Sequence, residues 1–427
     1  MTHRTYVLAL LTAIAFLNGA DQSVMASVTQ PVAREFRLAD SQLGLLGSAF
    51  ILVYALAIVP FGAWADAGRR SRVMAAGIAV WSVATLAGGL AVGYVHLLVA
   101  RAAVGAGEAS YLPAGNSLIG DIFRREERAR ALAWVSAGLR AGVGIGLIGG
   151  GLVASQLGWR AAFLFAGVPG LFLAFLALRL REPARGGAEA VSATRRVGGE
   201  FSWSIYRDLL RIPTVLAVIA TVTFGFWVTA GIGYWIPIFV QRRFEVGVGP
   251  AGAIAGLPLL VGGVVGTFGG AWLVDRLARR RASGAFEVTT AAFVLGAGFA
   301  ALAFSTRALP IFVASYLLMV TFLGVFIPAL QAVAQSVILP TQRATGVTLA
   351  LLVGNLLGNA IAPLAIGAMS DAIGDLGRTL QVATVSACVL AALASAAGIR
   401  YAGRDARRMD EAWARLATGG VSASEAP

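Results

Sequence analysis

The stretch "GAWADAGRRSR" at residues 62–72 has a counterpart, "AWLVDRLARRR", at residues 271–281. Both stretches follow a long apolar run and end in a group of arginines, and their aspartates, Asp66 and Asp275, lie about half the chain apart. A charged segment repeated at half-chain spacing is typical of transporters built from two related membrane repeats. The pair therefore predicts two structurally related halves with matching loops on one side of a membrane.

The composition agrees with a membrane-embedded chain. Of 427 residues, 58% are hydrophobic and only 13% are charged, about half the ~25% charged share of soluble domains. The mean hydropathy is +0.78. Too few polar side chains are present to cover a water-facing surface, so the bilayer is the expected solvent.

Apolar runs of spanning length recur along the whole sequence, each close to or above the ~20 residues that cross the hydrocarbon core as a helix. We therefore expect an all-α integral membrane protein with twelve transmembrane helices in two six-helix halves. The expected spans are 6–28, 41–65, 73–94, 96–121, 131–155, 160–180, 214–239, 250–275, 286–305, 309–334, 344–370 and 377–400.

The basic residues set the expected orientation. All 34 are arginine, and with the N-terminus inside, 25 lie in cytoplasmic segments, seven in external loops and two within spans. Arginine accumulates on the cytoplasmic side of membrane proteins. We expect a multi-pass protein of the cell (inner) membrane with both termini cytoplasmic.

The same pattern predicts four regions. Residues 1–180 form the N-terminal six-helix half, 181–211 a cytoplasmic linker, 212–400 the C-terminal half and 401–427 a cytoplasmic tail. The linker ends in "WSIYRDLLR", which could be a short helix on the inner leaflet. The tail spaces Met409, Trp413 and Leu416 along one helical face, so it lies either on the membrane or in solvent.

The first charged loop resembles the signature of the major facilitator superfamily, Gly, three residues, Asp, two residues, Gly-Arg-Arg, with Ala67 in place of the usual basic residue. The stretches "RAAVGAGEASYLPAGNSLIGDIF", "GWRAAFLFAGVPGLFLAFL" and "YWIPIFVQRRFEVG" resemble its Spinster-like branch. The resemblance implies alternating access, with lysolipids, sphingoid lipids or related solutes as cargo and protons as the linked ion. It also suggests an inner gate formed by Gly62, Asp66, Gly68, Arg69, Arg70, Asp275, Arg279 and Arg280.

Ionisable residues within the spans are the candidate coupling site. Arg101 and Glu108 are seven residues apart and so share one face of a helix, and Asp21 belongs to a polar stripe with Asn18 and Gln22 in the first span. Asp21 and Arg101 have matching depth and can pair. Charged groups at membrane depth are costly and usually face a bundle interior or a water path. A buried structural salt bridge is the alternative.

Two departures from the Spinster-like pattern concern arginine. Gln22 stands where that pattern has arginine after the first-span aspartate, and the fifth span carries Arg140 near a position that usually holds proline. We expect Arg140 to replace the lost charge and to pair with Glu108. The alternative is an arginine whose head reaches the inner surface.

Further cavity candidates are aromatic and amide side chains within the spans. For the aromatics, simple packing or an interfacial belt is an equal alternative, whereas an amide facing lipid would lack hydrogen-bond partners. The candidates are Tyr54, Tyr111, Trp227, Tyr234, Trp235, Gln331, Gln335, Asn355 and Asn359.

Several other function classes lack the residues they need. One cysteine and two histidines are too few for a zinc site or a Ser-His-Asp triad, so no enzyme, metal or cofactor is expected. "GIGLIG" at 144–149 matches a dinucleotide motif without its preceding strand, and its Gly-x-x-x-Gly spacing suits helix packing. The arginines lie between apolar runs rather than on a basic domain, which argues against nucleic acid.

Together these features predict a secondary transporter, proton-linked, for an amphipathic or anionic organic solute. Its partners would be membrane lipid, the solute and protons, and we expect a monomer. A proton symporter for small organic acids or sugar acids is the first alternative. A drug/proton antiporter is a weaker one, because the fifth span lacks the Gly-Pro pair typical of that class.

Overall fold

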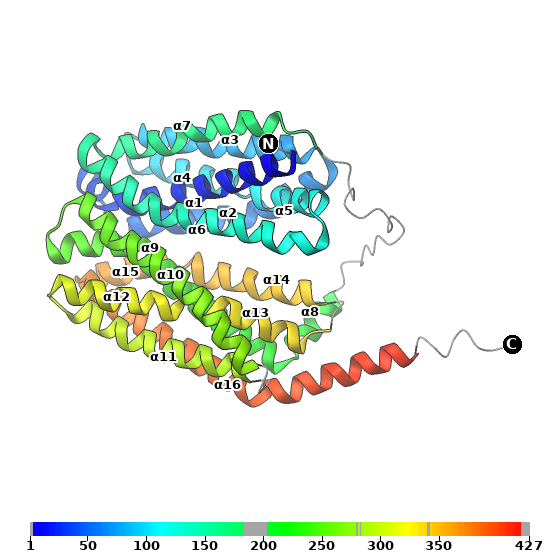
Figure 1. Ribbon diagram of the computed structural model, residues 1–427. Coiled ribbons are helices and arrows are strands. Elements are labelled where there is room, and N and C mark those ends of the chain that lie inside the picture. The colour runs from blue at the N-terminus through cyan, green and yellow to red at the C-terminus, as the bar shows by residue number, and fades with distance from the viewer. Residues whose placement is uncertain (1–2, 183–202, 279–280, 282, 340–341, 420–427) are drawn as a thin grey trace. The chain divides into compact units, whose positions relative to one another are not determined.

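The computed structural model describes residues 3–182, 203–278, 281, 283–339 and 342–419 (Figure 1). These residues are almost entirely helical, as expected where the bilayer offers no hydrogen-bond partners to the backbone. Each of the twelve expected spans corresponds to one helix or to a pair of consecutive helices. Eleven helical segments are long and apolar enough to cross a membrane, and the remaining span is interrupted.

The first six spans are formed by seven helices: α1 (His3–Phe36), α2 (Asp40–Ala67), α3 (Arg70–Gly89), α4 (Tyr94–Glu108), α5 (Tyr111–Ile122), α6 (Arg125–Leu157) and α7 (Trp159–Leu178). The fourth span is broken at Ala109 and Ser110, so α4 and α5 share it. Neither half of that span alone reaches the ~20 residues that a crossing needs.

The second six spans are also partly divided. They comprise α9 (Pro213–Phe244), α10 (Val248–Ala278), α11 (Gly284–Ser305), α12 (Leu309–Leu323), α13 (Phe326–Val337), α14 (Arg343–Gly354), a π-helical turn at Asn355–Asn359, α15 (Ala362–Ile373) and α16 (Leu376–Gly419). The short α8 (Trp203–Leu210) precedes them, and it confirms the helix expected at the end of the linker. Most of that linker, residues 183–202, lies outside the described residues.

Packing divides the chain into two compact units that cross the predicted halves. Among the described residues, unit 1 contains those within 3–182, 230–260 and 360–379, and unit 2 contains those within 203–229, 261–359 and 380–419. Parts of α9, α10 and α15 thus pack with the first six spans. The four regions expected from the sequence stay a prediction, since packing units and sequence repeats are different divisions.

Glycines bring α1 and α6 together within unit 1. A Cβ on Gly142 would lie 2.0 Å from the Phe16 carbonyl oxygen, and one on Gly146 would lie 2.6 Å from the Ala20 Cα. Such contacts leave room for hydrogen only, which is how small residues allow helices to approach in lipid. The Gly-x-x-x-Gly spacing therefore has the helix-packing role expected for it.

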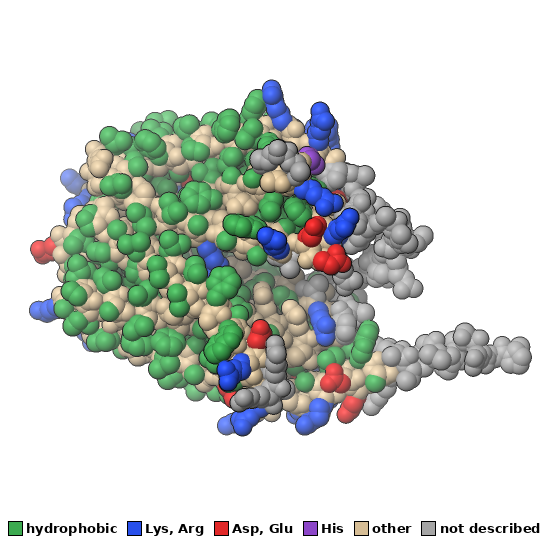
Figure 2. All heavy atoms as spheres, in the orientation of Figure 1, with side chains coloured by type: hydrophobic (Ala, Val, Ile, Leu, Met, Phe, Trp, Pro, Cys, Tyr) green, Lys and Arg blue, Asp and Glu red, His purple; other side chains and the backbone are tan. Residues whose placement is uncertain are grey.

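The surface carries many large apolar side chains. Figure 2 shows hydrophobic side chains over the faces of the helices and most charged side chains toward the helix ends. On α7, for example, Phe165 and Phe172 are 61% and 62% exposed. An exposed apolar surface of this kind would be unstable in water and fits hydrocarbon.

Candidate functional site

The candidate site lies in unit 1, where close packing buries the ionisable residues of α4. A Cβ on Gly105 would lie 2.3 Å from the Phe50 carbonyl oxygen of α2, and one on Gly107 would lie 2.6 Å from the Trp81 nitrogen of α3. These glycines hold α4 against both neighbours. As a result Arg101 and Glu108 are only 3% and 1% exposed.

Asp21 on α1 is buried beside α3. Its side chain is 1% exposed, and its Oδ2 accepts a hydrogen bond of 2.7 Å from the Thr85 hydroxyl. The other oxygen, Oδ1, is buried without a hydrogen-bond partner. A single hydroxyl donor is little compensation for a buried carboxylate, so this group needs a proton, water or a nearby cation.

Glu108 is held from α1. Gln22 Nε2 donates a hydrogen bond of 2.9 Å to Glu108 Oε2 and one of 2.9 Å to Asn18 Oδ1. Glu108 Oε1 and Asn18 Nδ2 are buried and unpartnered. The predicted polar stripe of the first span and Glu108 therefore meet at one place, which we call the polar cluster: Asn18, Asp21, Gln22, Arg101 and Glu108.

Arg101 contributes the positive charge of the polar cluster. Its guanidinium carbon lies 4.8 Å from the centre of the Phe50 ring, while Nε and Nη1 are buried without hydrogen-bond partners. A cation over an aromatic face gains part of what it loses on leaving water. The unpartnered Nε and Nη1 groups of Arg101 are available to donate hydrogen bonds to an anionic group or to water.

Two expected ion pairs are absent from the described part of the chain. No Asp21–Arg101 or Arg140–Glu108 pair lies within the 4.0 Å limit of a salt bridge. Thr85 and Gln22 supply the hydrogen bonds to the two carboxyl groups instead. Matching depth along two helices did not specify which donor each carboxyl group contacts.

Arg140 has a different environment from the one expected. It lies fifteen residues into α6, and its side chain is exposed. Within the described residues no hydrogen bond or ion pair of Arg140 is found. An arginine at this distance from the helix end, about 22 Å, needs water or an anion.

The other predicted cavity residues divide between the units. In unit 1, the Tyr111 hydroxyl donates to the Leu11 carbonyl oxygen at 3.0 Å, Trp235 Nε1 donates to the Pro363 carbonyl oxygen at 3.2 Å, and the Tyr234 hydroxyl donates to the Leu43 carbonyl oxygen. These bonds give the three residues a structural role, while Tyr54 packs beside Phe50 with ring centres 6.3 Å apart.

Unit 2 holds the remaining candidates. Asn359 Nδ2 donates to Asn355 Oδ1 at 3.1 Å across the π-helical turn, and Asn355 Nδ2 donates to the Leu351 carbonyl oxygen at 2.9 Å. Such turns are common at functional sites. Trp227, Gln331 and Gln335 lie on α9 and α13, and their cavity role stays a prediction.

The inner-loop motif at residues 62–72 is anchored within unit 1. Arg70, 2% exposed, donates from Nη1 to Ser117 Oγ at 2.9 Å and pairs with Asp121 at the end of α5. The Ser71 amide donates to Glu182 Oε1 at 2.9 Å. Sequence reasoning missed Asp121 and Glu182 as partners, although both stand in the stretches "GDIF" and "REP" that follow apolar runs.

Glu182 owes its charge to these contacts. Burial would raise the pKa of this carboxyl group, but hydrogen bonds from the Ser71 hydroxyl and amide, together with the nearby Arg70, hold the pKa below its usual value. Asp66 lies in the last turn of α2, with its side chain outside the description, and a Cβ on Gly62 would meet nothing within 4 Å. Arg279 and Arg280 are likewise outside the described residues, and Asp275 is exposed on α10.

A second charged group lies where α2 begins, and sequence reasoning missed it. Arg242 of α9 donates to both carboxylate oxygens of Asp40, at 2.8 and 2.7 Å, and the Ser370 hydroxyl donates to the same carboxylate at 2.6 Å. Asp371 accepts the amide hydrogens of Asp40 and Ser41 at 2.9 Å each. We call Asp40, Arg242, Ser370 and Asp371 the Asp40 cluster.

A bundle of apolar spanning helices that buries a polar cluster on its first and fourth spans is typical of a membrane transporter of the alternating-access type. The family model of the Major Facilitator Superfamily matches residues 11–363. The chain belongs to this superfamily, within its Spinster-like group.

Two curated relatives are similar to the chain over most of its length. Protein spinster homolog 1 of Homo sapiens is 30% identical over 389 residues, covering 86% of this chain and 72% of the relative. An MFS-type efflux pump of Mycolicibacterium smegmatis is 29% identical over 381 residues, covering 87% of this chain and 86% of the pump.

Among solved structures, a bacterial homologue of the human lysosomal transporter Spinster, inward-facing and unoccupied, superposes with a TM-score of 0.84. It is 26% identical, and the match covers 96% of this chain and 98% of that one. A nucleoside transporter with a TM-score of 0.72 and 13% identity shares the fold alone. The similar proteins are transporters, and none of these matches points to an enzyme.

Proposed function

We propose that the protein couples proton movement to transport of an amphipathic or anionic organic solute. The observation that carries the proposal is the polar cluster, in which two buried carboxyl groups, Asp21 and Glu108, each keep one oxygen without a partner. Carboxyl groups that lose and regain a cationic or hydrogen-bonding neighbour can bind and release a proton.

Charge on the solute is supported by the two arginines within spans. Arg101 keeps unpartnered donors in the polar cluster, and Arg140 has no protein partner among the described residues. Both therefore suit an anionic headgroup or carboxylate, which arginine binds through paired hydrogen bonds. The Spinster-like relatives make an amphipathic solute the first candidate, and a small organic acid the second.

The proposal includes a cell-membrane location, cytoplasmic termini and a monomeric protein. The orientation rests on the arginine distribution, which favours the side of the inner-loop motif as cytoplasmic. With that orientation, the connection between α1 and α2 and the Asp40 cluster face the outside.

The test is transport in proteoliposomes with and without a pH gradient, using a panel of lysolipids, sphingoid lipids and organic acids. Asp21→Asn and Glu108→Gln should remove proton-driven uptake while leaving solute exchange, because exchange needs no net proton transfer. Asp410→Asn and Glu411→Gln change exposed acids of the tail and serve as matched controls. Undiminished proton-driven transport in both site variants would refute the coupling.

Export is a second candidate, favoured by the similarity to the mycobacterial efflux pump. The two candidates predict opposite responses to the same gradient. A proton symporter accumulates solute when the outside is acidic, whereas an exporter exchanging protons for solute accumulates it in inverted vesicles whose interior is acidic. Measuring both vesicle orientations distinguishes them.

A further inference from the structure

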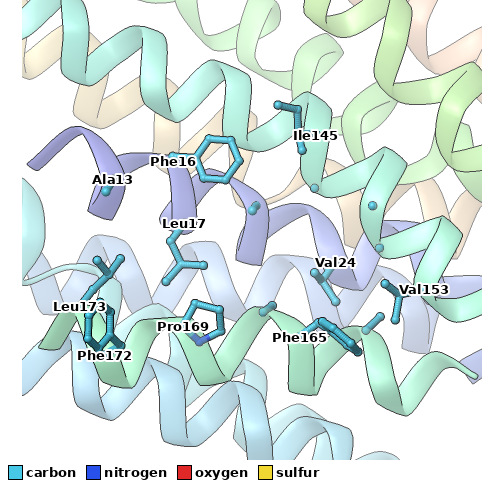
Figure 3. A pocket seen from close by; sticks show the side chains of 16 residues that line it. Ala13, Phe16, Leu17, Val24, Ile145, Val153, Phe165, Pro169, Phe172 and Leu173 are labelled. Carbon is cyan, nitrogen blue, oxygen red and sulfur yellow. The ribbon is translucent and has the colours of Figure 1, made fainter. Parts of the chain in front are cut away.

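An apolar groove lies on a face of α1 next to the one that carries the polar cluster. Its walls are α6 and α7 and its base is α1, as Figure 3 shows for Phe16, Leu17, Ile145, Phe165 and Pro169. The cavity measures about 430 Å³, within the ~300–1,000 Å³ range of small-molecule sites. No charged side chain lines it.

The groove exists because glycine and proline replace larger helix formers where α6 and α7 would otherwise meet. A Cβ on Gly149 would meet nothing within 4 Å, so this position opens onto free space. Gly146 and Gly150, in contrast, face α1 closely, because a Cβ on them would lie 2.6 Å and 2.5 Å from atoms of that helix. Pro169 lies within α7 on the facing wall.

The length of the groove is close to the thickness of one leaflet. Its base runs from Ala13 to Val24 of α1, a rise of about 16 Å, and half of a ~30 Å hydrocarbon core is about 15 Å. Val153 lies four residues before the end of α6, and Ala162 lies three residues after the start of α7. The groove therefore begins about one turn from the α6–α7 connection and extends along α7 to Leu173, about 21 Å from the start of that helix.

The groove is also continuous with the surface that faces hydrocarbon. Its rim residues Ile145, Phe165 and Phe172 are 46%, 61% and 62% exposed, and they belong to the apolar outer face of α6 and α7. A lipid chain reaches the groove from this surface without crossing any polar group. Nothing in the groove would bind a water-soluble ligand.

We propose that this groove is a binding site for one acyl chain of a phospholipid from the adjoining leaflet of the bilayer. The chain lies along α1 between α6 and α7, separate from the polar cluster. Because α1 carries Asn18, Asp21 and Gln22 on a neighbouring face, the bound chain supports the helix that positions the polar cluster.

The test uses the full-length protein in phosphatidylcholine bilayers that contain an analogue with a photoactivatable group in mid-chain. Cross-linked peptides are mapped, and the yield on residues 145–173 is compared with that on the exposed α10 face at Val264, Val265 and Phe268. The proposal predicts a several-fold excess on the groove in the native protein. Equal yields on the two surfaces would overturn it.

A variant with the groove filled gives an independent test. Gly149→Leu places its side chain in the groove without a backbone clash and should remove the excess, whereas Gly298→Leu, at an exposed α11 glycine that also has nothing within 4 Å, should keep it. An unchanged excess in a correctly folded Gly149→Leu protein would contradict the proposal. If that variant does not fold, the native comparison of the two surfaces still decides the question.

Discussion

Hydrogen-bond donors decide how each buried acid of this protein behaves. Glu182 accepts hydrogen bonds from the Ser71 amide and hydroxyl and forms an ion pair with Arg70, whereas Asp21 and Glu108 each accept one side-chain hydrogen bond. A carboxylate with several donors stays charged and structural, whereas one with a single donor can take up a proton when its surroundings change. This difference separates Glu182, which anchors the inner-loop motif, from Asp21 and Glu108, the proposed coupling residues.

The Glu182 contacts predict a pH-dependent contribution to stability. The folded pKa lies below the usual value of 4.5, so the stabilisation is complete above about pH 4.5 and is lost as the pH falls through the folded value. Glu182→Gln should cost about 1–3 kcal/mol at pH 7 and should flatten the decline of Tm below pH 5. Thermal unfolding in detergent measures this. Glu411→Gln, on the exposed tail, should match the native protein at every pH.

Arg140 supports a second prediction at this scale. If its exposed guanidinium binds the anionic group of the solute, Arg140→Ala should raise KM for an anionic solute by about tenfold or more, since a lost charged hydrogen bond costs ~1.5–3 kcal/mol. A neutral analogue of the solute should be affected little. Arg130→Ala, an exposed arginine nearer the start of α6, is the control. Equal KM changes for charged and neutral solutes would indicate a structural role instead.

At the scale of elements, the sequence predicted nearly all of the helices and none of their interruptions. Hydropathy predicts the position of a span because a helix that crosses the hydrocarbon core needs about 20 apolar residues. All twelve predicted spans correspond to helices in the structure. The breaks at Ala109–Ser110 and after Leu323, and the π-helical turn at Asn355–Asn359, leave the composition of a span unchanged. The ion pairs between distant segments could not be predicted from the sequence either. Asp40 and Arg242, for example, are 202 residues apart, and no local periodicity links them.

The start of α2 supplies a prediction about one element. Its N-cap residue is Ala39, which has no side-chain acceptor, and Asp371 from α15 accepts the first two amides of the helix instead. Asp371→Ala should cost about 0.5–2 kcal/mol, the usual effect of losing an N-cap acceptor. Asp410→Ala removes an exposed acid from the interior of α16, where it caps no helix. It should have a smaller effect on Tm, and equal losses would argue against the capping role.

At the scale of the whole molecule, the Asp40 cluster joins segments from both sets of six spans within unit 1. Asp40 and Ser41 belong to the first set, and Arg242, Ser370 and Asp371 belong to the second. Alternating access requires these contacts to form in one state and to break in the other. A contact made in one state only shifts the equilibrium by its own free energy, so the cluster should favour the state in which this end is closed.

Labelling of a buried cysteine measures that equilibrium. Ser48 is 6% exposed, and its hydroxyl accepts the Leu364 amide at 3.1 Å, so Ser48→Cys should react slowly while this end is closed. The only native cysteine, Cys388, is buried and gives a low background. In the Ser48→Cys protein, adding Arg242→Ala removes a two-point ion pair worth ~1.5–3 kcal/mol and should raise the labelling rate by about tenfold or more.

The chain offers a matched control for this experiment. Glu35 and Arg160 form a similar two-point pair, at 2.6 and 2.9 Å, but both belong to the first six spans and remain together in either state. Arg160→Ala in the Ser48→Cys protein should therefore remove a two-point ion pair, one more exposed than Asp40–Arg242, without a rise in labelling. If both arginine variants accelerate labelling equally, general destabilisation explains the effect. If neither does, closure of this end depends on the close approach of Gly44 to Pro363 rather than on charge.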